Sequence, residues 1–212
     1  MYIPAHFQCL DSDVFDLLAN MGGVELVTAG PGGMVATFMP MLYKREGSSR
    51  GLLQGHLARA NPQVRAGSSA EALVIVHGTD SYISPSYYPS KADHGKVVPT
   101  WNYLTAHVYG DLVLHDDPDW VRENVSALTD KHESIRTHPW SVYDAPPDYL
   151  EAMLRAIVGV EIVVTRIEAK AKLSQNRNPT DVEGVITGLE ALGDLEGADA
   201  VRHARDLRAQ RY

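Results

Sequence analysis

The sequence predicts an α+β protein in which antiparallel strands form one sheet or barrel and helices follow mainly in the second half. Three observations support this class. β-rich runs alternate with Gly and Pro turns in residues 24–84, a β-branched run returns at Val160–Ile167, and apolar residues at helical spacing dominate after residue 116. No internal repeat or change of composition divides the 212 residues, so we expect a single domain over residues 1–212.

The chain should begin with a helix followed by a β-hairpin. Ser12 can cap a helix over Asp13–Asn20. Two β-rich runs, Val24–Ala29 and Met34–Met39, flank the cluster Gly30–Gly33 and predict two paired strands with a tight turn. Because a strand and not a helix follows these glycines, we interpret them as a turn rather than a phosphate-binding loop.

The next part of the chain should add strands separated by polar breaks. The predicted elements are, in chain order, a β run at Leu52–Leu57 with a break at Asn61-Pro62, a β run at Ala72–His77, a turn at Gly78–Asp80 into Ser81–Ser84, a long functional or disordered loop over residues 85–96, and one or two strands in Trp101–Leu114. Gly110 interrupts the alternation of this last segment.

The second half should be mainly helical. The predicted elements are a helix opened by Asp116–Pro118, a helix opened by Pro146–Asp148 and stopped by Gly159, the strand Val160–Ile167, a helix with the capping box Thr180–Glu183, and an amphipathic tail helix over Leu195–Arg211. We expect the early strands and the late strand to belong to one antiparallel sheet.

Composition excludes several classes of protein. The single cysteine, Cys9, rules out an internal disulfide and a four-cysteine zinc site. With 19 Lys and Arg against 27 Asp and Glu, the net charge of -8 disfavours a protein that coats nucleic acid. No apolar run reaches the roughly 18 residues of a membrane span, and Met1–His6 does not resemble a signal peptide, so we expect a cytoplasmic protein without membrane contact.

The nine histidines form no familiar catalytic or metal motif. His132-Glu133 lacks the second histidine of a zinc-protease helix, and the Gly-x-Ser-x-Gly elbow of a serine hydrolase is absent from the sequence. We therefore interpret most histidines as structural or solvent-exposed. The histidines leave open one functional alternative, a protein that handles haem or a metal ion, beside the two functions given at the end of this section.

Two polar segments could hold an anionic ligand. In residues 54–62, His56 and Arg59 follow a strand, and an arginine can bind an anion through a bidentate fork. The alternative for this segment is an arginine on a solvated turn. Residues 166–177 carry four cations against one acid, and the alternative there is a polar connector before the next helix.

Aromatic residues gather between these two segments. Tyr82–Lys91 and Val98–Tyr103 combine aromatic rings with hydroxyl groups and a lysine. Such side chains could cover a flat ring and its polar edge. The alternative is a loop that its aromatic rings pin to the surface.

Segments along nearly the whole chain resemble the PaiB family, the FMN-binding negative transcriptional regulators. The segments that carry the resemblance are Met1–Pro4, Gly55–Pro62, Tyr82–Tyr88, Pro99–Tyr103, His107–Gly110, Leu128-Thr129 with His132-Glu133, and Lys172–Arg177. The resemblance implies a split antiparallel β-barrel flanked by helices, similar in plan to the pyridoxamine-phosphate oxidases. It also implies a homodimer with FMN at the interface between the subunits.

The resemblance further implies which residues bind the cofactor. It places the FMN phosphate beside the segment that ends at Asn61-Pro62, and it covers the flavin ring with the Trp101 region and Lys172–Arg177. The residues predicted to bind FMN are His56, Arg59, Asn61, Ser84, Trp101, Lys172, Gln175 and Arg177. The chain departs from the family pattern at Phe38, Ala169 and Ala171, so flavin affinity should be weak or lost if these positions touch the ring.

The family resemblance and the composition together indicate two main functions. The first is a flavin-binding regulator of transcription. Because the chain is acidic and carries no helix-turn-helix signature, we expect regulation through a partner or ligand rather than by direct reading of DNA. The second is an FMN-dependent oxidoreductase acting on a small molecule, in which the flavin carries the hydride.

Overall fold

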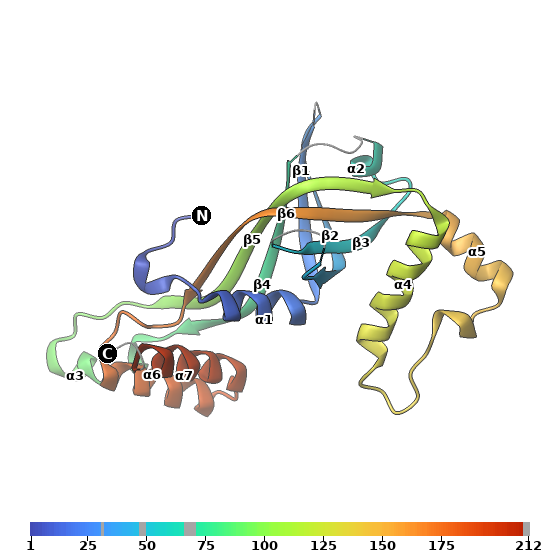
Figure 1. Cartoon of the computed structure of the whole chain (residues 1–212). Coiled ribbons are helices and arrows are strands. Elements are labelled where there is room, and N and C mark those ends of the chain that lie inside the picture. Colours follow the sequence, from blue (N-terminus) through green and yellow to red (C-terminus); the bar gives the residue numbers. More distant parts are fainter. Residues whose placement is uncertain (31, 47–49, 66–70, 210–212) are drawn as a thin grey trace. The chain divides into compact units, whose positions relative to one another are not determined.

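The computed structural model describes the chain except for residues 31, 47–49, 66–70 and 210–212. The described chain forms two compact units (Figure 1). We call Phe15–Val76 together with His107–Glu168 the barrel unit. We call Met1–Val14 together with His77–Ala106 and Ala169–Tyr212 the terminal unit.

Six strands form a closed antiparallel barrel whose order is β1-β2-β3-β6-β5-β4. The strands are β1 (Gly23–Gly30), β2 (Gly33–Lys44), β3 (Leu52–Ala58), β4 (Glu71–Ile83), β5 (Thr100–His115) and β6 (Ile157–Lys172). The late strand β6 pairs with the early strand β3 in antiparallel register, with Leu53 opposite Ile162. This confirms the predicted α+β class and the joining of early and late strands in one sheet.

The first two strands form the predicted hairpin. Leu26 lies opposite Thr37, and the ladder closes at the pair Gly30 and Gly33. Gly33 has a φ of 103°, in the left-handed region that glycine adopts without steric cost. The cluster is therefore a turn, as predicted from the strand that follows it.

The core of the barrel unit comes from alternate residues of its strands. The fully buried side chains of this core include Val24, Leu26, Leu53, Val74, Val76, Val108, Val160 and Ile162. Gly110 interrupts the alternation of β5 for a packing reason, since a Cβ at this position would lie 2.3 Å from the carbonyl oxygen of Val163. The glycine lets β5 approach the backbone of β6.

Four helices belong wholly or mainly to the barrel unit. They are α1 (Asp11–Asn20), α2 (Pro62–Arg65), α4 (Pro118–Glu133) and α5 (Pro147–Arg155), with a 3-10 turn η3 (Val142–Asp144) before α5. The Asp117 side chain caps α4 by accepting a hydrogen bond from the Asp119 N–H, and proline occupies the first turn as predicted. The helix α4 packs on β3.

The terminal unit is built around two antiparallel helices, α6 (Pro179–Ala191) and α7 (Leu195–Ala209). It also contains α3 (Ser90–His94) and the 3-10 turns η1 (Ala5–Phe7) and η2 (Pro85–Tyr87). Its core is a cluster of buried residues that includes Ile83, Tyr88, Leu173, Val182, Val185, Ile186, Leu189, Ala198 and Val201. This second core, from residues 83–88 in the middle of the chain and 171–204 near its end, was not foreseen from the sequence.

Two glycines that predicted chain breaks lie inside continuous strands. The turn predicted at Gly78–Asp80 is wrong, because β4 runs without interruption to Ile83. A Cβ at Gly78 would lie 3.0 Å from Leu104, so the glycine serves close packing. Gly159 likewise lies within β6 and does not end a helix. The position requires glycine for packing, because a Cβ there would lie 2.2 Å from the ring of Trp120.

Two further expectations need correction. The long loop predicted over residues 85–96 contains the short elements η2 and α3. Ser84 caps η2, and Pro85 at its first position favours the helical turn. The predicted capping box at Thr180 is also wrong. The cap of α6 is Asn178, whose side chain accepts a hydrogen bond of 2.8 Å from the Asp181 N–H.

Candidate functional site

His56 lies on β3 in the barrel unit, half-buried beside α4. Its Nδ1 and the amide atoms of Asn124 on α4 are buried without a well-formed hydrogen bond to any described residue. Burial lowers the pKa of His56, and the neighbouring Asn124 amide offsets part of that change. A histidine in this setting is neutral at pH 7, so it can offer a ligand one N–H but no positive charge.

Arg59 follows β3 and is engaged by protein groups on several sides. Its Nη2 lies 2.6 Å from Asp116 Oδ1 and 3.0 Å from the carbonyl oxygen of Ile157. Its Nε donates to the carbonyl oxygen of Arg155 at 2.9 Å. The carboxylate raises the pKa of Arg59, and the guanidinium lowers the pKa of Asp116. Arg59 therefore joins the end of β3 to the ends of β5 and α5, and an anionic ligand would compete with Asp116 for it.

Asn61, the third predicted residue of the barrel unit, belongs to a buried hydrogen-bond network. Its Nδ2 donates to Thr37 Oγ1 at 3.1 Å, and its Oδ1 accepts from the Gln63 N–H at 2.8 Å. Gln63 is 1% exposed, and its amide contacts groups on β1 and β2. Sequence reasoning missed Gln63, although its place directly after the family-like segment Gly55–Pro62 could have indicated it.

Trp101 and Lys172 are brought together in the terminal unit. Trp101 is 54% exposed, and its ring lies 6.0 Å from that of Tyr82, which is also largely exposed. Lys172 Nζ donates to the Trp101 carbonyl oxygen and to Thr100 Oγ1. Burial lowers the pKa of Lys172, and the cations Lys170 and Arg177 lower it further. These contacts place the ammonium group against the backbone of Trp101, and it lies 5.8 Å from the centre of the Tyr103 ring.

The segment Leu173–Arg177 is a turn held by its own side chains. Gln175 Oε1 accepts from the Leu173 N–H and Gln175 Nε2 donates to the Ala171 carbonyl oxygen, both at 2.7 Å. Ser174, with a φ of 66°, is buried and exchanges hydrogen bonds with the buried Asn102. The side chain of Gln175 thus has a structural role. The sequence analysis missed the Ser174–Asn102 pair, although both residues lie in segments that carry the family resemblance.

The last two predicted residues lie elsewhere in the terminal unit. Ser84 accepts a hydrogen bond from the Ser86 N–H and caps η2. The guanidinium of Arg177 lies 4.6 Å from the centre of the Tyr88 ring. Of the eight predicted residues, His56, Arg59 and Asn61 belong to the barrel unit and the other five to the terminal unit. Their assignment to FMN stays a prediction.

Chemically, the two sets differ. In the barrel-unit set, Arg59 and Asn61 donate to protein acceptors, whereas His56 Nδ1 has no hydrogen-bond partner among the described residues. The terminal-unit set offers exposed aromatic surface and an adjacent cation, which suits a flat anionic molecule. Among the described residues, no group of three or more His, Cys, Asp and Glu side chains is placed to hold a metal ion.

Comparison with models of known protein families shows to which family the chain belongs. A family described as "Putative FMN-binding domain" matches residues 1–166, most of the chain. The chain belongs to this FMN-binding domain family. The family expected from the sequence motifs is therefore confirmed.

Individual relatives agree with this assignment. The chain is 34% identical over 192 residues to the protease synthase and sporulation protein PAI 2 of Bacillus subtilis, covering 90% of this chain and 89% of the relative. It is also 34% identical over 190 residues to the protein AN0679 of Emericella nidulans, covering 76% of each.

Solved structures share the fold at low sequence identity. A conserved hypothetical protein, Rv2991 of Mycobacterium tuberculosis, has a TM-score of 0.56 at 12% identity, covering 84% of this chain and 94% of that protein. The FAD and heme binding protein of Mycobacterium smegmatis has a TM-score of 0.56 at 19% identity, covering 77% of this chain and 71% of that protein. Within the described part of this chain, no helix is both long enough and apolar enough to cross a membrane.

Proposed function

We propose that this protein binds FMN and acts as a flavin-dependent regulatory protein. The family match over residues 1–166 carries this proposal. Two features support it: the exposed rings of Trp101 and Tyr82, since an isoalloxazine ring stacks on aromatic surface, and the Lys172 ammonium at the Trp101 backbone, since a phosphate binds a cation. Similar folds include the FAD and heme binding protein and the flavocytochrome Anf3 of Azotobacter vinelandii.

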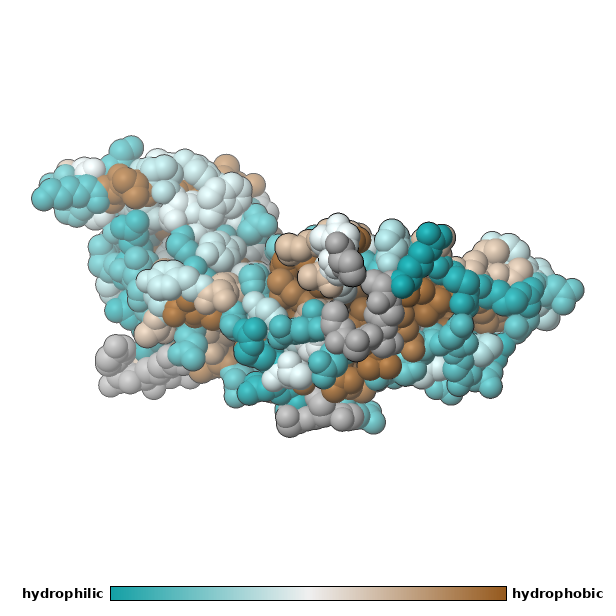
Figure 2. Space-filling model, turned by 90° about the horizontal axis from the view of Figure 1, so that it is seen from above, coloured by the Kyte–Doolittle hydropathy of each residue, from teal (hydrophilic) through white to brown (hydrophobic). Residues whose placement is uncertain are grey.

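We further propose that two copies of the chain pair through the outer face of the β1–β2 hairpin. Met34 is 77% exposed and Phe38 is 71% exposed on this face of the barrel unit. The register places Ala36 between them, opposite the half-buried Val27. Figure 2 shows one face of the molecule, on which hydrophobic patches interrupt the hydrophilic surface, while the hairpin face itself is defined by the exposed fractions of Met34 and Phe38. Contiguous exposed apolar residues on a folded protein mark an interaction surface.

Direct reading of DNA is not part of this proposal. Outside residues 166–177, the main basic cluster of the sequence consists of Arg202, Arg205, Arg208 and Arg211, of which Arg211 lies outside the described residues. In the structure, Arg202 pairs with Glu190 and Asp199, and Arg205 pairs with Glu183 and Asp206. With Arg202 and Arg205 neutralised and only Arg208 without an acidic partner among the described residues of α7, this helix does not make the basic stripe that phosphate backbones require. Regulation through the bound flavin or a protein partner agrees better with this charge pattern.

Titration of purified protein with FMN tests the cofactor. We expect a bound flavin whose affinity falls about 10- to 100-fold in Lys172→Gln, if the ammonium meets the phosphate, and about 2- to 10-fold in Trp101→Ala, from lost stacking. Lys91→Gln and Trp140→Ala, which alter exposed residues outside the predicted set, are the matched controls. Protein that neither binds FMN nor gains thermal stability from it would contradict the proposal.

The absorbance of the same purified protein distinguishes a regulatory flavoprotein from the alternative, an FMN-dependent oxidoreductase. An enzyme would lose its flavin absorbance when a nicotinamide donor is added and recover it with an acceptor. A regulatory flavoprotein that does not turn over would keep its oxidised spectrum on that timescale.

A further inference from the structure

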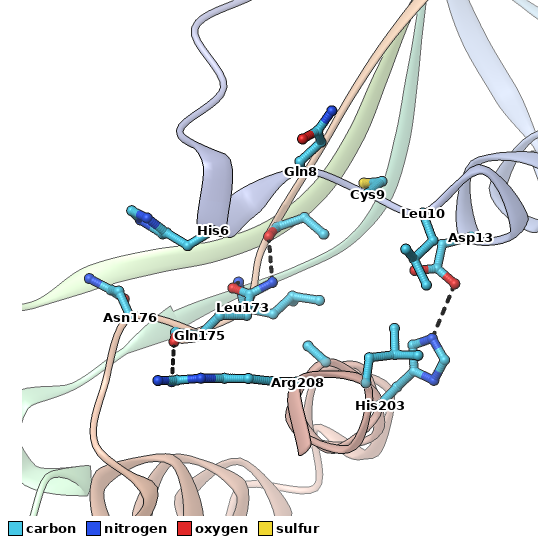
Figure 3. Close-up of a pocket in the computed structure, with 13 residues that line it drawn as sticks. His6, Gln8, Cys9, Leu10, Asp13, Leu173, Gln175, Asn176, His203 and Arg208 are labelled. Carbon is cyan, nitrogen blue, oxygen red and sulfur yellow. Dashed lines mark hydrogen bonds and ion pairs between the residues drawn. The ribbon is translucent and has the colours of Figure 1, made fainter. Parts of the chain in front are cut away.

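The terminal unit contains a cavity of about 430 Å³ between the N-terminal segment, the end of β6 and the helix α7 (Figure 3). This volume falls within the range of small-molecule sites in proteins. Gln175 is the one residue of the predicted FMN set that lines it, and its side chain is bonded to backbone groups of its own turn. The cavity therefore needs an explanation apart from the flavin.

Five aliphatic side chains form one part of the cavity lining. Ala171, Leu173 and Ala204 line it and also belong to the core of the terminal unit, so this part of the lining is rigidly supported. Leu10 and Leu207 add partly buried aliphatic surface. An aliphatic or aromatic group placed here would leave water and contact hydrocarbon on several sides.

One end of the cavity carries a positioned cation. Arg208 Nη1 donates to the carbonyl oxygens of Gln175 at 2.6 Å and Arg177 at 3.3 Å. These bonds fix the guanidinium, and its Nε and Nη2 make no hydrogen bond to the described residues. The side chains of Asn176 and His6 lie at the same end (Figure 3). This group of donors matches a carboxylate, which an arginine can bind in a bidentate manner.

The opposite end is closed by an acid that already has a partner. His203 Nε2 lies 3.2 Å from Asp13 Oδ1, away from Arg208 (Figure 3). Cys9 lies in the wall as a neutral thiol, because burial raises its pKa to about 12. Asp13 adds a negative charge at this end, so a carboxylate is expected at the opposite end, on the guanidinium of Arg208.

From this arrangement we propose that the cavity binds a small organic acid. The carboxylate would lie on Arg208 and Asn176, and the apolar body would lie on Leu10, Leu173 and Leu207. Such a site could sense a metabolite, and it does not depend on flavin binding.

Calorimetric titration of the full-length protein with hexanoate, hexylamine and hexan-1-ol tests the proposal. The three probes share one alkyl chain and differ in the charge of the head group. We expect hexanoate to bind at least about tenfold more tightly than the other two, because a charged hydrogen bond to Arg208 separates them. Equal binding of all three, or no binding of hexanoate, would overturn the proposal.

Matched variants locate the bound acid. Arg208→Gln should weaken hexanoate about 10- to 100-fold, whereas Arg205→Gln, on the same helix but outside the cavity, should leave the affinity unchanged. Equal losses in both variants would refute the assignment to this cavity. Competition between FMN and hexanoate would make the cavity part of the flavin site, and would also overturn the proposal. Independent binding of the two ligands is the expected result.

Discussion

Replacing Gln63 by alanine should strongly destabilise the barrel unit. Gln63 follows the predicted phosphate-binding turn and is 1% exposed. Its Oε1 accepts a hydrogen bond from Thr37 Oγ1 at 2.5 Å. Its Nε2 lies 3.0 Å from Thr28 Oγ1, 3.2 Å from the Leu26 carbonyl oxygen and 3.3 Å from that of Val35.

The magnitude follows from these contacts. An amide NH₂ group has two protons, so it serves two of the three neighbouring acceptors at a time, and the side chain makes three hydrogen bonds in all. At about 1 kcal/mol for each bond, their loss lowers the free energy of unfolding by about 3 kcal/mol. The cavity left by the missing side-chain atoms adds about 1 kcal/mol.

Urea unfolding followed by circular dichroism measures this change. The Gln63→Ala variant should unfold at a lower urea midpoint with an unchanged slope. Arg65→Ala is the matched control, because Arg65 is exposed on the same short helix α2. A loss below about 1 kcal/mol, no more than a typical single hydrogen bond, would refute the reasoning that this amide ties β1, β2 and the Asn61 turn together.

Three further predictions concern the dimer, the pH dependence and the phosphate. Phe38→Glu should shift the protein from dimer to monomer in size-exclusion chromatography without loss of helical signal, whereas Tyr143→Glu, equally exposed, should not; a dimeric Phe38→Glu protein would contradict the proposed interface. Because burial lowers the pKa of His56, the unfolded state binds its proton more readily, so this residue's contribution to stability is present above about pH 6.5 and is lost as the pH falls through the folded-state pKa. His56→Gln should reduce that loss of stability in denaturation curves measured between neutral and acid pH, and an unaltered pH profile would exclude His56 as its source. Arg59→Ala should weaken FMN about 10- to 100-fold if the guanidinium leaves Asp116 for the phosphate, and unchanged affinity in an FMN titration would place the phosphate elsewhere.

Local patterns determined much of the secondary structure. Proline in the first turn located the starts of α4 and α5, because a proline at this position loses no helical hydrogen bond. Two β-rich runs on either side of a Gly/Pro cluster located β1 and the first part of β2. These signals succeed because they depend on interactions among residues a few positions apart.

The glycines were interpreted correctly only where the chain itself turns. Gly33 adopts a positive φ in a hairpin, which sequence neighbours reveal. Gly78 and Gly159 instead make room for Leu104 and Trp120, which are distant in sequence. In the sequence, a glycine required by a turn cannot be distinguished from a glycine required by close packing. The two can be distinguished only when the residue that packs against the glycine is known.

The sequence by itself determined the family, which segments form most of the strands and helices, and which segments hold the predicted FMN residues. The tertiary structure decided which of those side chains are engaged elsewhere. It paired Arg59 with Asp116, fixed Gln175 to its own turn and brought Lys172 to Trp101. It also formed the cavity beside Arg208 from residues at both ends of the chain. Hydrogen bonds and cavities between residues far apart in sequence exist only once the backbone has placed them, so no local pattern encodes them.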